Sequence, residues 1–146
     1  MSLLADHPTG VELLSASLAE YYTDASHLTE VQRIIEHKDQ QVTQRLLEHL
    51  VFDYAQHNPC DYVWRGQQLN IKRAVDNLLR TVQRKQFDPF RRRGTELVVG
   101  QPGLRSTVAQ LLFFKWIQQT GVLNYAREHA AQIRESMRLK TRKRKR

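Results

Sequence analysis

The stretch from Leu28 to His57 places the strongest limit on what this chain can fold into. It contains neither glycine nor proline, and its apolar side chains recur at helical spacing. Asp39 lies between two apolar runs and is one of the residue types that cap helices. The stretch therefore predicts either one long helix or two helices in series. Residues 58–61, which include a proline, end the pattern.

Four other segments carry apolar stripes at helical spacing, and these are residues 9–22, 67–86, 104–117 and 122–137. Segment 104–117 is wider in its apolar face than one contact needs, which predicts a central core helix or a helix buried between subunits. Residues 96–99 fit one helical turn or a strand, and the breakers at 100–103 follow them. Because no convincing sheet is visible, the sequence predicts an all-α fold of five or six helices.

The positive charge is concentrated at one end of the sequence. The chain has 23 Lys and Arg residues against 15 Asp and Glu residues, a net charge of +8. Seven of the nine residues in 138–146 are basic, and without them 16 basic and 15 acidic side chains remain, a net charge of +1. A segment of like charges with a single apolar residue has no core to bury. We therefore predict a helical domain over residues 1–137 and a disordered basic tail over 138–146.

A short polycation is expected to bind polyanions, which include RNA, DNA, anionic lipid and acidic protein. Nucleic-acid binding is predicted for the seven basic residues of the tail, which are Arg138, Lys140, Arg142, Lys143, Arg144, Lys145 and Arg146. A nuclear localisation signal is compatible with this role, and a solubilising end is the alternative. Arg91, Arg92 and Arg93 form a second basic run, for which a solvated loop is favoured over a phosphate contact.

No pattern in the sequence indicates an enzyme. The chain has six histidines and one cysteine, and His57 and Cys60 have a metal-ligand spacing, but zinc needs three or four ligands and no second pair lies nearby. Glycine-rich phosphate loops, zinc-protease motifs and nucleophile elbows are absent. No apolar run reaches about 18 residues, the length that a membrane helix needs. We expect no cofactor, no metal, no small-molecule substrate and no membrane insertion, and the single cysteine favours a reducing compartment.

Two stretches carry a resemblance to a known family. The first is Gly-Val-Glu-Leu-Leu-Ser at 10–15 followed by Leu-Ala-Glu-Tyr-Tyr at 18–22. The second is an ordered series of short matches at 88–89, 96–99, 103–104, 110–114 and 122–125. Together with the basic end, this series resembles the hepatitis B-type core (capsid) protein. The match is patchy over 27–86, the family's bridging cysteine and its proline–tyrosine segment have no counterpart, and the tail is short, which favours a distant relative such as a nackednavirus capsid protein.

The resemblance implies a long helical hairpin, formed by 67–86 and about 95–119, that pairs with a second subunit into a four-helix-bundle spike. Its implied intra-dimer residues are Val75, Leu78, Leu79, Val82, Leu111 and Leu112. Its implied spike tip contains Asp88, Pro89, Arg91, Arg92 and Arg93. Its implied inter-dimer contacts are Tyr21, Tyr22, Phe113, Tyr125 and Arg134. The alternative for Tyr125 is an ordinary core residue.

The leading functional hypothesis is therefore a viral capsid protein. Residues 1–137 would form an assembly domain that dimerises and closes into an icosahedral shell, and the tail would package viral RNA or DNA nonspecifically. Such a protein is expected in the virion and in the cytoplasm or nucleus of the host cell. The alternative is a small helical regulatory protein that binds nucleic acid through a tail resembling a nuclear localisation signal. A third hypothesis is a membrane-surface protein whose tail binds anionic lipid.

Overall fold

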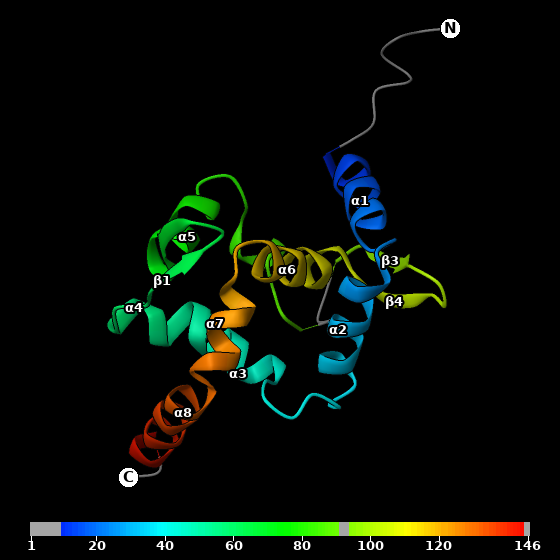
Figure 1. The fold of residues 1–146 in the computed structure, drawn as a ribbon. Coiled ribbons are helices and arrows are strands. Elements are labelled where there is room, and N and C mark those ends of the chain that lie inside the picture. Colours follow the sequence, from blue (N-terminus) through cyan, green and yellow to red (C-terminus); the bar gives the residue numbers. More distant parts are fainter. Residues whose placement is uncertain (1–9, 91–93, 145–146) are drawn as a thin grey trace, which may run out of the picture.

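Two small antiparallel sheets interrupt a chain that is otherwise mostly helical (Figure 1). The computed structural model describes residues 10–90 and 94–144. One sheet consists of β1 (Asp61–Trp64) and β2 (Gln67–Asn70), and the other of β3 (Glu96–Val99) and β4 (Leu104–Thr107). The fold is therefore mixed α/β, and the prediction of an all-α fold of five or six helices is wrong.

The β1–β2 hairpin replaces the first four residues of the predicted helix over 67–86 with strand β2. Its strands pair from Asp61 with Asn70 to Trp64 with Gln67. Arg65 and Gly66 form the two-residue turn, and both have positive φ angles, 51° and 79°. A two-residue turn with both φ angles positive matches the right-handed twist of the strands that it joins. The turn therefore specifies a hairpin where the apolar spacing predicted a helix.

Between Gly10 and His57 the described chain forms four α-helices and a π-helical turn. Helix α1 (Gly10–Tyr21) is followed by α2 (Ala25–Ile35), and the Asp24 side chain caps α2 by accepting from the Ser26 amide at 2.9 Å. Helix α3 then runs into η1 and α4 without a break, and their bounds are Gln44–His49, Leu50–Tyr54 and Ala55–His57. Of the two alternatives for 28–57, the structure has helices in series.

Helix α5 (Ile71–Leu78) and helix α6 (Val108–Gln119) occupy the segments in which the long hairpin was predicted. They have 8 and 12 residues, and the 3-10 turn η2 (Arg84–Gln86) and the β3–β4 hairpin separate them along the chain. Helix α5 ends at Leu78, and Thr107 caps the start of α6, so neither helix reaches the predicted tip at 88–93. The predicted hairpin and its four-helix-bundle spike are therefore corrected.

Helix α6 lies in the middle of the fold, with α1 and α7 packed against it (Figure 1). Its fully buried residues include Leu111, Phe113, Phe114 and Ile117. The wide apolar surface of this segment is thus covered by elements of the same chain, as one of the two alternatives predicted. Helix α7 (Val122–Glu128) follows after Gly121, whose φ of 80° and close approach to the Trp64 ring leave no room for a side chain.

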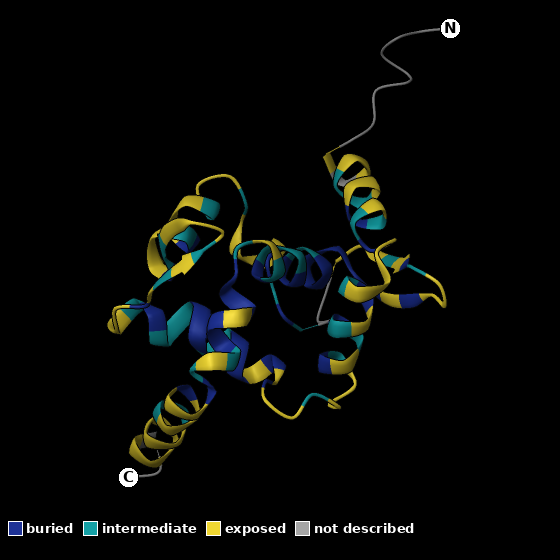
Figure 2. Cartoon of the chain, in the orientation of Figure 1, coloured by how far each residue is buried: buried dark blue, intermediate teal, exposed yellow. Residues whose placement is uncertain are grey.

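Helix α8 (Ala130–Arg144) leaves the body and ends at the exposed C-terminal side of the fold (Figure 1). Ile133 in its first half is fully buried, and α8 packs there against α3 and η1. Its second half is mostly exposed (Figure 2). The structure thus has a helix through Arg144 where the sequence predicted a disordered tail from residue 138. Cations in the last turns of a helix interact favourably with the negative end of the helix dipole, which supports helix in a basic segment.

Candidate nucleic-acid interface

An open groove of about 800 Å³ lies between the α3–η1 segment and the second half of α8. Its cationic side chains come from three separate elements, and they are Arg45 of α3, Arg84 of η2, and Arg138 and Lys140 of α8. Two carboxylates, Glu48 and Asp53, also line it. The groove therefore carries more positive than negative charge and continues onto the basic end of α8.

Asp53 of η1 lies at the centre of the charges in this groove. Its carboxylate forms an ion pair with Lys140 and lies 3.3 Å from the Nδ1 atom of His57 and 3.6 Å from that of His49. Burial, and then the positive charge of Lys140, lowers the pKa of His49. His49 is hence held in its neutral form, in which its Nε2 atom contacts the Ser136 hydroxyl at 3.0 Å. The Asp53–Lys140 ion pair thus joins the second half of α8 to η1.

The other basic residues in the second half of α8 have fewer partners in the rest of the fold. Arg138 donates from Nε to a Glu135 carboxylate oxygen at 3.0 Å, and this hydrogen bond lowers the pKa of Glu135. Arg142 and Lys143 are exposed and form no ion pair with any residue in 10–90 or 94–144. At Arg142 and Lys143, α8 thus presents positive charge that no ion pair within the described residues neutralises.

Phe52 of η1 and Arg84 of η2 form an aromatic–cation stack in the same groove. The Arg84 Cζ atom lies 3.4 Å from the centre of the Phe52 ring, well within the distance of a cation–π interaction. Arg84 also donates from Nη1 to the Phe87 carbonyl at 3.1 Å, and its Nη2 atom lies 3.9 Å from a Glu48 carboxylate oxygen. These contacts fix the guanidinium over the ring. Sequence analysis missed the pair because 31 positions separate the two residues.

The structure brings four predicted nucleic-acid residues together on one exposed helix, and these are Arg138, Lys140, Arg142 and Lys143. Arg144 ends that helix. Lys145 and Arg146 lie outside the described residues, as do Arg91, Arg92 and Arg93 of the predicted spike tip.

The aromatic residues predicted for inter-dimer contacts lie largely inside this chain. Tyr22 and Phe113 are fully buried, and the Tyr22 hydroxyl donates to the Leu111 carbonyl at 2.9 Å. Tyr125 is 7% exposed and packs against Tyr62, so the core alternative for Tyr125 fits its position. Burial raises the pKa of Tyr22 far above its ordinary value. These three side chains are core residues of one chain.

Two other predicted contact residues lie nearer the surface. Tyr21 is half-buried and stacks on His27, with ring centres 4.2 Å apart, and burial raises its pKa to about 12. Arg134 of α8 is exposed and donates to the Gln41 carbonyl within the same chain. Both residues are therefore engaged by contacts inside the chain.

The residues of the predicted hairpin and tip also pack inside this chain. The core contains Val75 and Leu111, and four half-buried residues pack against it, which are Leu78, Leu79, Val82 and Leu112. The Pro89 carbonyl accepts hydrogen bonds from the side-chain amides of Gln44 and Gln110, each at 2.9 Å. The Asp88 side chain accepts from the Phe90 amide at 3.0 Å. Residues 88–90 are thus tied into the core, which corrects the prediction of a protruding tip.

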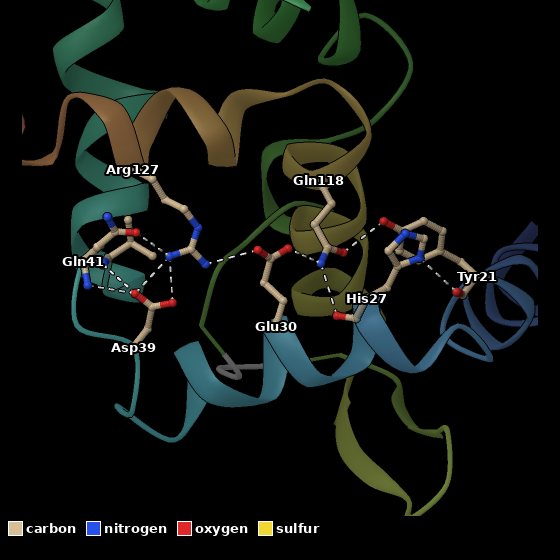
Figure 3. Close-up of polar contacts among 8 residues, drawn as sticks. Tyr21, His27, Glu30, Asp39, Gln41, Gln118 and Arg127 are labelled. Carbon is tan, nitrogen blue, oxygen red and sulfur yellow. Dashed lines mark hydrogen bonds and ion pairs between the residues drawn. The ribbon is translucent and has the colours of Figure 1, made fainter. Parts of the chain in front are cut away.

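A second charged cluster lies across the α2, α6 and α7 helices (Figure 3). Arg127 of α7 contacts Asp39 at 2.9 Å, Gln41 at 3.1 Å and Glu30 at 3.2 Å. The Gln118 amide donates to Glu30 at 2.9 Å, and the Tyr21 hydroxyl donates to Gln118 at 3.0 Å. Each charge in this cluster is matched by partners from other elements, so the cluster ties helices together.

The described residues provide neither a metal centre nor a membrane span. No group of three or more His, Cys, Asp or Glu residues there could hold a metal ion, and Cys60 is buried. Within the same residues, no helix is both long and apolar enough to cross a bilayer.

The sequence belongs to a family of unknown function, DUF7197, whose model matches residues 7–146. Neither the curated proteins nor the solved structures contain a match. The basic groove and the end of α8 therefore carry the functional argument.

Proposed function

We propose that this protein binds nucleic acid, largely without sequence preference, through the second half of α8 and the groove beside it. The observation that carries the proposal is the separation of charge: a chain of net charge +8 has seven of its positive charges in its last nine residues. Four of these residues lie on exposed turns of α8, and Arg142 and Lys143 form no ion pair with a described residue.

Binding would proceed by neutralisation of phosphates. Each Lys or Arg that contacts a phosphate releases condensed counterions, so the logarithm of the binding constant falls by about 0.7 per contact on single strands for each tenfold rise in salt. Phosphate contacts orient a protein on nucleic acid and carry no sequence information by themselves. The groove supplies further cations, Arg45 and Arg84, next to the helix.

The capsid hypothesis came from the sequence resemblance, which implied a long hairpin, and the fold has two short helices in its place. Assembly into a shell stays a prediction from the resemblance alone. No contact within the described residues favours it over a nucleic-acid-binding protein that acts without a shell. The contacts of α8 and its groove support the nucleic-acid-binding component, which both hypotheses share.

The test compares two double variants of equal charge by fluorescence anisotropy with a labelled oligonucleotide across a salt series. Arg142→Ser with Lys143→Ser removes two charges from the end of α8. Arg73→Ser with Arg80→Ser removes two exposed charges from the region of α5. We expect the first pair alone to weaken binding and to reduce the salt slope by about 1.4 on a single strand.

Two outcomes would contradict the proposal. Equal losses from both double variants would mean that only net charge matters. Binding to anionic vesicles that exceeds binding to oligonucleotides at equal salt would favour the membrane-surface hypothesis, because anionic lipid attracts the same cations.

A further inference from the structure

The groove beside α8 contains an aromatic–cation stack as well as charge. Phe52 is half-buried, and its ring packs edge-on against the fully buried Phe87, with ring centres 5.9 Å apart. On its groove side the ring carries the Arg84 guanidinium at 3.4 Å. The Arg84 side chain nevertheless keeps 45% of its surface exposed. A flat cation is thus presented to the groove on a rigid aromatic base.

We infer that this stack is a base-binding platform and that the preferred ligand of the groove is single-stranded nucleic acid. The inference rests on the proposed function and names its substrate class. Unpaired bases stack on aromatic side chains and on arginine guanidinium planes, whereas a duplex keeps its bases stacked and paired inside. A base on Arg84 would leave its flanking phosphates beside the cations of the groove, Arg45 and Lys140.

Three features of the site support a platform over a simple phosphate contact. Arg84 is held at both ends of its guanidinium, by the Phe87 carbonyl and by Glu48, so little side-chain entropy is left to lose on binding. Its Cζ atom lies 3.4 Å from the centre of the Phe52 ring, a distance at which a flat guanidinium contacts the ring face, as a point charge would not require. The groove, which is open and has a volume of about 800 Å³, has room for an unpaired base beside the guanidinium.

The decisive variant is Arg84→Lys in the full chain. It keeps the positive charge and removes the flat guanidinium, and these side chains are not interchangeable at stacked sites. The matched control is Arg80→Lys, which changes an exposed arginine outside the groove in the same way. The probes are labelled adenine oligonucleotides of about twelve nucleotides, as single-stranded RNA, single-stranded DNA and the corresponding DNA duplex.

For Arg84→Lys we expect about tenfold weaker binding of both single strands, with an unchanged salt slope and little change on the duplex. Arg80→Lys should leave all three affinities unchanged. Wild-type protein should also prefer either single strand over the duplex. A loss that is equal on single strands and duplex, or a wild-type preference for the duplex, would overturn the inference. In that case the phosphate contacts of the proposed function would still be measurable through the Arg142 and Lys143 variants.

Arg84→Lys also removes contacts within the fold, which could themselves change binding. A second measurement therefore uses the wild-type protein. The wild-type chain is titrated with a single strand whose bases are replaced by abasic sites, which retain every phosphate. We expect the affinity to fall about as much as for Arg84→Lys on the intact strand, again with the salt slope unchanged. Equal affinity for abasic and intact strands would refute base stacking whatever the variant does.

Discussion

The protein contains two clusters of charged side chains that differ in their balance. In the first cluster, a central cation, Arg127, is surrounded by Glu30, Asp39 and Gln41 (Figure 3). In the second cluster, a central anion, Asp53, is surrounded by Lys140 and two histidines. The charges of the first cluster are paired within the chain, whereas the second cluster lies in a groove that is lined by more cations than carboxylates.

The difference in surroundings follows from where each cluster lies. The Arg127 and Asp39 side chains are only 23% and 9% exposed, so their contacts form away from most of the solvent. Lys140 is 46% exposed and belongs to the second half of α8. This half of the helix is mostly exposed (Figure 2). A largely buried charge must be matched within the fold, because leaving it unpaired is costly. An exposed cation is free of that requirement and can be matched by a ligand, so position distinguishes the structural cluster from the cluster for which we propose binding.

Arg127→Met tests this comparison and has the largest expected effect, a loss of stability. The change leaves Glu30 and Asp39 without their cation while it preserves apolar bulk, and we expect a loss of about 2 kcal/mol in the free energy of unfolding, less than for a fully buried pair because Arg127 is partly exposed. Chemical denaturation measures it directly, and the melting temperature should fall by about 6 °C. Nucleic-acid binding of the folded variant should be unchanged.

The matched control for Arg127→Met is Arg105→Met. Arg105 pairs with Glu96 at 3.2 Å, and both side chains are more than half exposed. Its loss should cost less than about 0.5 kcal/mol. If both variants lost the same stability, the distinction between a matched structural cluster and an ordinary surface pair would be wrong.

Much of the helical framework could be predicted from the sequence. Apolar spacing located most of α6 and the start of α7. For 28–57 it left one long helix or two in series open, and the structure has two, with Thr43 as the cap of α3 and Asp39 in the loop before it. The charge count located the basic end. These predictions succeeded because they depend on neighbours within one or two turns, which a sequence displays directly.

The hairpins and the groove could not be predicted in the same way. Strands of four residues are too short to display alternation, and Leu69, Ile71 and Val75 continued a helical spacing across a strand boundary. The Arg65-Gly66 turn was the available signal for the first hairpin. The groove depends on pairs distant in sequence, such as Asp53 with Lys140, which no local pattern reveals. The sequence did not predict the helix at 138–144, because repulsion between the basic side chains favours disorder there. The helix dipole, which favours cations in the last turn, acts in the opposite direction.

Acidification should disturb the Arg127 cluster through Asp39. Burial alone would raise the pKa of Asp39, but hydrogen bonds from the Val42 and Gln41 amides and from Arg127 outweigh burial and lower it. The unfolded chain, with an Asp pKa near 3.9, therefore binds the proton first. Stability from Asp39 is complete above that pH and is lost as the pH falls through the lower folded value.

Asp39→Asn tests this pH dependence. At neutral pH we expect it to cost about 1 kcal/mol, since a charged acceptor is lost while the amide contacts can remain. Between pH 5 and pH 3, about the range over which Asp residues titrate, the variant should lose less stability than the wild type. Asp76→Asn, which removes an exposed carboxylate paired with Lys72, should keep the wild-type acid response. An Asp39→Asn chain that is as acid-sensitive as the wild type would exclude Asp39 as the titrating group.

The smallest expected effect comes from a groove variant, and it is a gain in binding where the preceding variants lose stability. Asp53→Asn removes the carboxylate that neutralises Lys140, so Lys140 becomes available to a phosphate. We expect about threefold tighter binding of a single-stranded oligonucleotide, the scale of an exposed ion pair, and a salt slope steeper by up to about 0.7. Asp76→Asn changes the net charge equally and frees Lys72 on α5, outside the groove, so it should leave both quantities unchanged. The free energy of unfolding should fall by about 1 kcal/mol for Asp53→Asn, because Asp53 is only 25% exposed and joins α8 to η1. For Asp76→Asn, a surface pair, it should change by less than about 0.5 kcal/mol. Tighter binding by both variants to the same extent would mean that overall charge, and not the position of Lys140 in the groove, governs affinity.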